Sequence, residues 1–162
     1  MFSQTILDQA RGFLDRARSQ GLRVVTAESC TGGMIAALLT EIPGSSDVVE
    51  RGFVTYSNEA KEDLLDVPAE LIHAHGAVSE PVARAMVEGA LKHSLAQLAV
   101  AVTGIAGPGG GTAEKPVGLV YVAVQRQGEA VRIKELRLGD LDRGAIRLTT
   151  VSQALTLLNQ IF

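Results

Sequence analysis

Short apolar segments alternate with amphipathic helical segments along most of the chain, and this alternation most constrains its fold. Apolar runs predict strands at 22–26, 48–56, 98–103, 117–125 and 131–138. Helical patterns cover 3–20, 34–39, 59–65, 80–93 and 142–162, and the segment 73–77 reads as a loop. Helices that alternate with strands cover both faces of a sheet, and the predicted closing hairpin needs an antiparallel pair. We therefore expect an α/β fold, a three-layer α/β/α sandwich with a mixed, mostly parallel sheet of about five strands.

Length and composition favour a single domain of ordinary size over residues 1–162, because no repeat or linker divides the 162 residues. The net charge of -3 argues against nucleic acid or an anionic membrane as a partner, since phosphates are bound chiefly by excess Lys and Arg. The single cysteine, Cys30, excludes an intramolecular disulfide and suits a reducing compartment. With no signal-peptide pattern or membrane-spanning stretch, we expect a cytoplasmic protein.

Three polar, glycine-bearing loops are candidates for the functional site. They cover 27–33 (AESCTGG), 104–112 (GIAGPGGGT) and the segment from Pro43 to Lys61 around the second predicted strand. In open α/β sheets ligands bind outside the carboxyl ends of the strands. We therefore expect the three loops to converge on one cleft.

The first two loops have the composition of anion-binding turns. At 27–33, free N–H groups at a helix start and two glycines favour an anion, although simple N-capping by Ser29 or Thr31 explains the same residues. At 104–112, a glycine-rich backbone could cradle phosphate or ribose, or form a flexible surface loop. The loop at 104–112 matches neither the pattern that binds ATP nor the pattern that binds dinucleotides.

The third segment supplies hydroxyl groups and an amine within a short span. A serine hydroxyl is a poor nucleophile until a base removes its proton, and a lysine serves as that base only if it is neutral. Lys61 follows a buried strand and could be desolvated there, although a solvated helix lysine is the common alternative.

A thiol and a metal site are weaker candidates. Cys30 could be activated at a helix N-terminus, or it could be a buried, inert cysteine. His73 and His75 have an HxH spacing, but zinc sites usually need at least three protein ligands and His93 belongs to another element. We predict no metal ion and no cofactor.

Five motifs in one order resemble the CinA C-terminal domain family over nearly the whole chain. They are TAESCTGG (26–33), GSS (44–46), RGFVTYSNEAK (51–61), HGAVSEPVA (75–83) and GIAGPGGG…KPVG (104–118). The resemblance implies a three-layer α/β/α fold with a mixed sheet and a plausible homo-oligomer. Longer members of the family carry an additional N-terminal domain, whose functions should not be transferred to this chain.

The resemblance also implies an activity, hydrolysis of the carboxamide of nicotinamide mononucleotide to nicotinate mononucleotide and ammonia in pyridine nucleotide salvage. In that family a serine and a lysine are thought to act without metal, and the matching positions are Ser46 and Lys61, with Tyr56 as an assisting hydroxyl. Ser29 and Arg143 also match positions associated with the site. The predicted substrate contacts are Ser29, Thr31, Gly32, Gly44, Ser45, Gly107, Gly109, Gly110 and Arg143.

Two other classes of function stay open. A non-catalytic domain could bind pyridine nucleotides and sense them for a partner, with no release of ammonia. A hydrolase could instead use Cys30 as its nucleophile, which predicts inactivation by thiol alkylation. Whether Ser46 or Ser29 is the nucleophile is not decided by the sequence.

Overall fold

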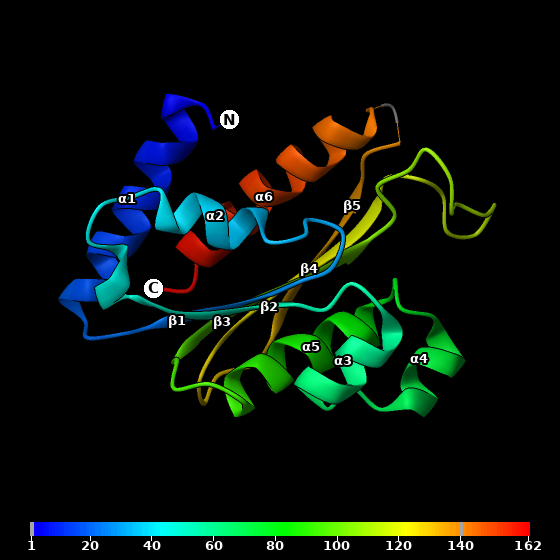
Figure 1. The fold of residues 1–162 in the computed structure, drawn as a ribbon, viewed down its shortest axis with the longest axis horizontal. Helices are drawn as coiled ribbons and strands as arrows, with labels where there is room; N and C mark the ends of the chain where they lie inside the picture. The colour runs from blue at the N-terminus through cyan, green and yellow to red at the C-terminus, as the bar shows by residue number, and fades with distance from the viewer. Residues whose placement is uncertain (1, 140) are drawn as a thin grey trace.

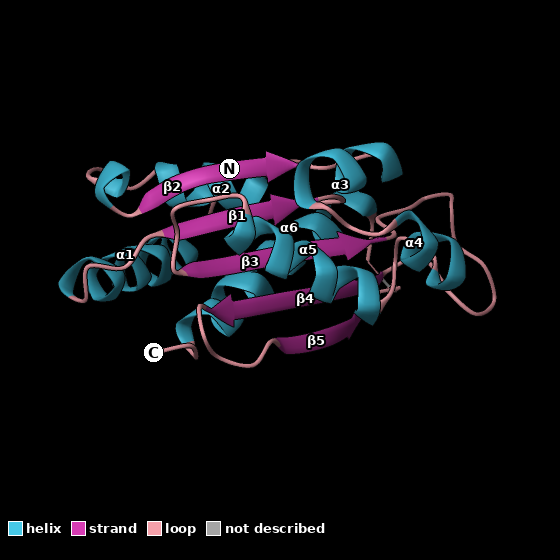
Figure 2. Cartoon of the chain, turned by 90° about the horizontal axis from the view of Figure 1, so that it is seen from below, coloured by secondary structure: helices cyan, strands magenta, loops and turns pink. Residues whose placement is uncertain are grey.

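A five-stranded mixed sheet forms the centre of the computed structural model, which describes residues 2–139 and 141–162. The strands are β1 (Val24–Glu28), β2 (Val49–Val54), β3 (Leu98–Gly104), β4 (Leu119–Arg126) and β5 (Arg132–Arg137). Their order is β2-β1-β3-β4-β5. β1 is parallel to β2 and β3, whereas β4 is antiparallel to β3 and β5, so β4 alone runs against the others (Figure 2). The predicted α/β fold is confirmed.

Helices cover both faces of this sheet. They are α1 (Gln4–Ser19), α2 (Met34–Thr40), α3 (Asn58–Leu65), α4 (Ala69–His75), α5 (Glu80–Lys92) and α6 (Arg143–Asn159), with a short 3-10 turn, η1 (Ser45–Asp47). Figure 1 shows α1, α2 and α6 on one face and α3, α4 and α5 on the other. Each face buries its own apolar cluster, which gives the molecule two cores separated by the sheet.

Local capping fixes where several helices begin. The side chains of Ser57, Ser79 and Asp142 each accept a hydrogen bond from the backbone N–H three residues further on. Such a cap stabilises a helix by about 1 kcal/mol, because it satisfies a donor that the helix itself leaves free. The caps at Ser57 and Asp142 fix the starts of α3 and α6, which carry the candidate site residues Lys61 and Arg143.

The alternation of side chains along β1 decides which residues reach each core. Val24 packs into the cluster under α1, α2 and α6, whereas Val25 and Ala27 pack into the cluster under α5. Glu28 returns to the α2 face, where its carboxylate contacts the start of that helix. By the same alternation, Ser29 points toward the face that carries α3.

Two predicted elements differ from the structure. The segment 73–77 was expected to be a loop, but α4 runs from Ala69 to His75 between Pro68 and Gly76. α4 buries only Ile72, so it has almost no apolar periodicity to mark it as a helix. β1 begins two residues later than predicted and extends to Glu28. In the part of the chain that the structure describes, no helix has the length and apolarity to cross a membrane.

Candidate active site

Three hydroxyl residues lie level with one another where the parallel strands end. Glu28 pairs with Val102, so the next residues along each strand, Ser29 and Thr103, are neighbours. The Ser29 N–H donates to the Val102 carbonyl at 3.1 Å, and the Thr55 N–H donates to the Glu28 carbonyl at 2.8 Å. Ser29, Thr55 and Thr103 therefore follow one another across the carboxyl edge of the sheet, where open α/β folds bind ligands.

Lys61 reaches back from α3 to this row of hydroxyl groups. Its Nζ lies 3.2 Å from Ser29 Oγ and donates to the carbonyl oxygens of Thr55 at 2.8 Å and Ser57 at 3.4 Å. The side chain is only 1% exposed. Burial lowers the pKa of Lys61 below its ordinary 10.5, because the charged ammonium loses its hydration, and Cys30 opposes this shift weakly. The predicted desolvation of Lys61 is present.

A cavity of about 300 Å³ opens beside Ser29 and Lys61. Seven of the residues predicted for the site line it: Ser29, Tyr56, Lys61, Gly107, Gly109, Gly110 and Arg143. The loops after β1, β2 and β3 contribute to its wall together with the first residue of α6. The loops that follow β1, β2 and β3 therefore converge on one cleft, although only some residues of each loop line it.

Arg143 connects two of these loops. Its Nη1 donates to the Gly107 carbonyl at 2.6 Å, and its Nη2 donates to the Tyr56 hydroxyl at 3.0 Å. Tyr56 was predicted to assist Ser46 and Lys61 with its hydroxyl, but this hydroxyl accepts a hydrogen bond from Arg143 instead. Tyr56 thus contacts the cation at the edge of the cavity, and the residue is 61% exposed.

The predicted pairing of Ser46 with Lys61 is not formed, and this is the main correction to the sequence analysis. Gly44, Ser45 and Ser46 precede β2 and Lys61 follows it, so they lie at opposite edges of the sheet. Six strand residues at about 3.3 Å each separate these edges by roughly 20 Å. The Gly44 carbonyl accepts from Arg18 Nη2 at 2.9 Å, and none of the three residues lines the cavity.

Thr31 and Gly32, which were predicted to contact substrate, do not line the cavity either. Thr31 is buried, and its hydroxyl donates to the Glu28 carboxylate at 2.6 Å. The same carboxylate accepts from the N–H groups of Gly33 and Ile35, so the donors expected to bind an anion already face a negative charge. Gly32 lies outside the cavity with a φ of +57°, a conformation that glycine adopts readily.

Three residues of this region were missed by the sequence analysis. Thr103 lines the cavity, and its hydroxyl donates to the Ala77 carbonyl at 2.8 Å. Its place at the end of the most apolar strand, directly before the glycine-rich loop, was a usable signal. Glu28 and Arg147 hold the turn around Ser29. The contacts of Glu28 are local, whereas Arg147 reaches the turn only through tertiary packing, which no sequence signal indicates.

Cys30 lines the same cavity but is poorly suited to act as a nucleophile. The residue is 5% exposed, and burial raises the pKa of its thiol to about 11, with smaller opposing contributions from its own backbone N–H and from nearby cations. A thiol with this pKa is protonated at neutral pH, whereas the reactive form is the thiolate.

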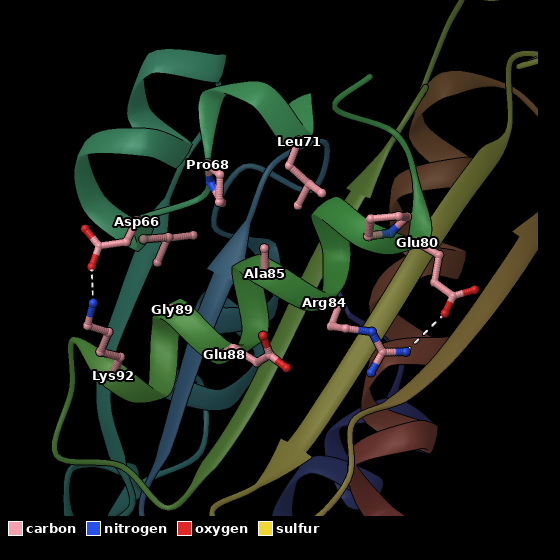
Figure 3. A pocket seen from close by; sticks show the side chains of 11 residues that line it. Asp66, Pro68, Leu71, Glu80, Arg84, Ala85, Glu88, Gly89 and Lys92 are labelled. Carbon is pink, nitrogen blue, oxygen red and sulfur yellow. Dashed lines mark hydrogen bonds and ion pairs between the residues drawn. The ribbon is translucent and has the colours of Figure 1, made fainter. Parts of the chain in front are cut away.

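A larger hollow of about 500 Å³ lies between α4 and α5 (Figure 3). Four of the five charged side chains that line it form two pairs, as Lys92 Nζ lies 2.6 Å from Asp66 and Arg84 Nη2 lies 3.1 Å from Glu80. No hydroxyl, thiol or imidazole is among the residues that line it. Within residues 2–139 and 141–162, no three His, Cys, Asp or Glu side chains gather as metal ligands.

Comparisons with known proteins identify the chain's relatives. The chain is 52% identical to a CinA-like protein of Anaeromyxobacter sp. (strain Fw109-5) over 88% of its length and 34% of that protein. A CinA-like protein of Akkermansia muciniphila is also 52% identical, over 84% of this chain and 33% of that protein. The chain thus spans about a third of the length of these relatives.

Solved structures agree with the same assignment. The crystal structure of the competence/damage inducible protein CihA from Agrobacterium tumefaciens is 54% identical and superposes with a TM-score of 0.97, covering 99% of this chain and 97% of that one. A CinA superfamily protein from Escherichia coli, 31% identical, gives a TM-score of 0.91 over 99% and 93% of the two chains. The family model described as the CinA C-terminal domain matches residues 8–162. The chain therefore belongs to the CinA C-terminal domain family.

Proposed function

We propose that the protein is a serine amidohydrolase in which Ser29 is the nucleophile and Lys61 its general base. The observation that carries the proposal is the 3.2 Å contact between Lys61 Nζ and Ser29 Oγ, made by a lysine that is 1% exposed. A nucleophile within hydrogen-bond reach of a desolvated base is the arrangement that such chemistry needs.

The surroundings of Lys61 favour its neutral form. A neutral amine has two N–H donors and one lone pair, and the carbonyl oxygens of Thr55 and Ser57 can take both donors. The lone pair then faces the Ser29 hydroxyl. None of the salt bridges among the described residues involves Lys61, so no carboxylate holds its proton.

The proposed substrate is nicotinamide mononucleotide, and the products are nicotinate mononucleotide and ammonia. The family resemblance supports this substrate, and the cavity supports a small ligand with an aromatic carboxamide and an anionic group. Arg143 supplies a cation and the loop at Gly107–Gly110 supplies backbone N–H groups, so we place the phosphate there. Glu28 disfavours the alternative position at residues 29–33. We further propose that the reaction serves pyridine nucleotide salvage in the cytoplasm.

The proposed reaction has two stages. Lys61 takes the Ser29 proton while Oγ bonds to the carboxamide carbon, and the C–N bond then breaks as Lys61 returns the proton to the leaving nitrogen, releasing ammonia. Water next attacks the acyl-enzyme, giving its proton to Lys61, and the Ser29 oxygen leaves with that proton. Backbone N–H groups around the cavity stabilise the oxyanion, each worth about 3–4 kcal/mol.

Ammonia release from nicotinamide mononucleotide by chelator-treated protein tests the proposal. We expect Ser29→Ala and Lys61→Met to lower kcat by about 100-fold or more, since each removes one member of the catalytic pair. Ser46→Ala is the matched control, because Ser46 lies at the other edge of the sheet and should leave kcat unchanged.

Two results would move us to another function. If Ser46→Ala lost activity and Ser29→Ala kept it, our choice of nucleophile would be wrong. If the wild-type protein bound the nucleotide and released no ammonia, the domain would be a sensor of pyridine nucleotides rather than an enzyme.

A further inference from the structure

A buried carboxylate holds the donor groups of the turn at residues 29–33, which we call the Ser29 turn. Glu28 is fully buried, and its Oε2 accepts from Thr31 Oγ1 at 2.6 Å and from the N–H groups of Gly33 at 3.2 Å and Ile35 at 3.0 Å. Its Oε1 accepts from the Ala36 N–H at 2.9 Å. Hydrogen bonds to a charged acceptor are about twice as strong as neutral ones, so this carboxylate fixes the turn to the start of α2.

A guanidinium group holds the acceptor groups of the same turn from the other side. Arg147 lies on α6, and its Nε donates to the Cys30 carbonyl at 3.0 Å while its Nη2 donates to the Thr31 carbonyl at 3.1 Å. The guanidinium is planar and presents its N–H donors in a fixed geometry, so it can bind both carbonyl groups at once. A Cβ at Gly32 would lie 3.4 Å from Nη2, so the turn packs closely on this side chain.

We propose that Glu28 and Arg147 are positioning residues that hold Ser29 in place for attack. In the Ser29 turn the carboxylate binds the Thr31 hydroxyl and the Gly33 N–H, whereas the guanidinium binds the Cys30 and Thr31 carbonyl groups. Neither side chain lines the cavity, so neither touches the ligand. The proposal rests on Ser29 being the nucleophile, and it adds that the orientation of Ser29 depends on a residue of the last helix.

This role predicts a loss of rate rather than of binding. Arg143 and the glycine-rich loop are proposed to hold the phosphate, and neither belongs to the Ser29 turn. A displacement of about 1 Å at a reacting atom lowers rates by about 100-fold. Removal of either positioning residue should therefore lower kcat and leave KM nearly unchanged.

The first test measures ammonia release by Arg147→Lys, Arg147→Met and Glu28→Gln. We expect kcat to fall by about 10- to 100-fold with KM changed by less than about twofold, and Arg147→Lys, which keeps the charge, to lose least. Arg84→Met and Glu80→Gln are matched controls, because they remove an exposed ion pair on α5 and should leave both constants unchanged.

A second test separates positioning from general damage to the fold. In a Ser29→Ala background, Arg147→Met should leave the dissociation constant for nicotinate mononucleotide unchanged. Acylation of Ser29 by an activated aryl ester, followed by intact mass, should slow in Arg147→Met by the same factor as kcat. Unchanged kcat, weakened product binding, or an activity loss matched by loss of folded protein at the assay temperature would each overturn the proposal.

The acylation assay also distinguishes failure of the proposal from failure of the proposed substrate. If the wild type is acylated at Ser29 but does not act on the nucleotide, the substrate is wrong and the acylation rates of the variants still decide the role of Glu28 and Arg147. If Ser29 is not acylated and Ser29→Ala stays active, both the nucleophile and its positioning residues are wrong.

Discussion

At the scale of single residues, the protonation of Lys61 sets the expected dependence of the reaction on pH. Burial lowers the pKa of Lys61 below 10.5, and the neutral amine is the form that can accept the Ser29 proton. We therefore expect kcat/KM to rise with pH through this lowered pKa and then to level off. Lys61→Met should lack the rising limb, and a wild-type profile that falls with pH over the same range would contradict the assignment.

The lowered pKa of Lys61 also affects the stability of the fold. Its effect is opposite to that of the raised pKa of a lysine in an ion pair. The unfolded chain keeps the Lys61 proton up to the ordinary pKa of 10.5, whereas the folded chain loses it earlier. Between the two pKa values the unfolded state binds more protons, so this group's contribution to the free energy of unfolding rises with pH. Lys61 therefore costs stability at neutral pH, as functional residues often do.

Cys30 provides a second residue-scale prediction. Because its thiol has a pKa of about 11 and is buried, we expect iodoacetamide to alkylate it slowly at pH 7.5 and faster as the pH approaches that value. Cys30→Ala should keep kcat within a few-fold of wild type. Rapid alkylation at neutral pH with matching loss of activity, together with an inactive Cys30→Ala, would instead support a cysteine nucleophile.

At the scale of helices and strands, a glycine of α5 packs directly against the end of the lysine-bearing helix. A Cβ at Gly89 would lie 2.0 Å from the carbonyl oxygen of Leu65, the last residue of α3. Backbone atoms cannot give way as a flexible side chain can, so Gly89→Ala must push α3 away from α5. The displacement would also move Lys61, which lies one turn before Leu65.

Urea denaturation of two glycine variants tests this packing. We expect Gly89→Ala to lower the free energy of unfolding by about 1–3 kcal/mol and to lower kcat, because it overpacks a buried contact. Gly12→Ala is the matched control on α1, where nothing lies within 4 Å of the added Cβ, and it should stabilise by about 0.5–1 kcal/mol. Equal effects at both positions would show that the α3–α5 contact is less tight than the structure indicates.

Most elements could be predicted from the sequence because their patterns are local. The buried stripe of α1, including Phe13 and Leu14, has the spacing of a helix, and the unbroken apolar run of β3 is typical of a central strand. α4 could not, since its seven residues bury one apolar side chain and its stability comes from packing beside α5.

The candidate site was only partly predictable. Lys61 and Arg143 were placed in it on the family resemblance, and both line the cavity. The error at Ser46 could have been avoided, because Ser46 precedes its strand while Ser29 follows one, and parallel strands bring only their carboxyl ends to one ligand site. The role of Arg147 could not have been predicted, since it depends on how α6 packs against the Ser29 turn, whereas Glu28 contacts residues only three to eight positions further along the chain.

At the scale of the whole molecule, the site is assembled from segments that are far apart in the chain. β1 lies between β2 and β3, and its partner in β3 begins 74 residues later, as Val24 pairs with Leu98. Arg147 reaches Cys30 across 117 residues. By contrast, β4 and β5 are joined by a short turn and pair locally.

This arrangement has a consequence for how the protein refolds. Local pairing forms faster than pairing across long loops, so the β4–β5 hairpin should form early and the docking of α6 on the Ser29 turn late. After dilution from urea, we expect the far-UV circular dichroism signal to recover before ammonia-releasing activity. Recovery of both signals with one rate constant would contradict this order. Because Arg147 follows Cys30 by 117 residues, a nascent chain would carry its nucleophile long before the residue that positions it, and it would stay inactive until α6 had left the ribosome.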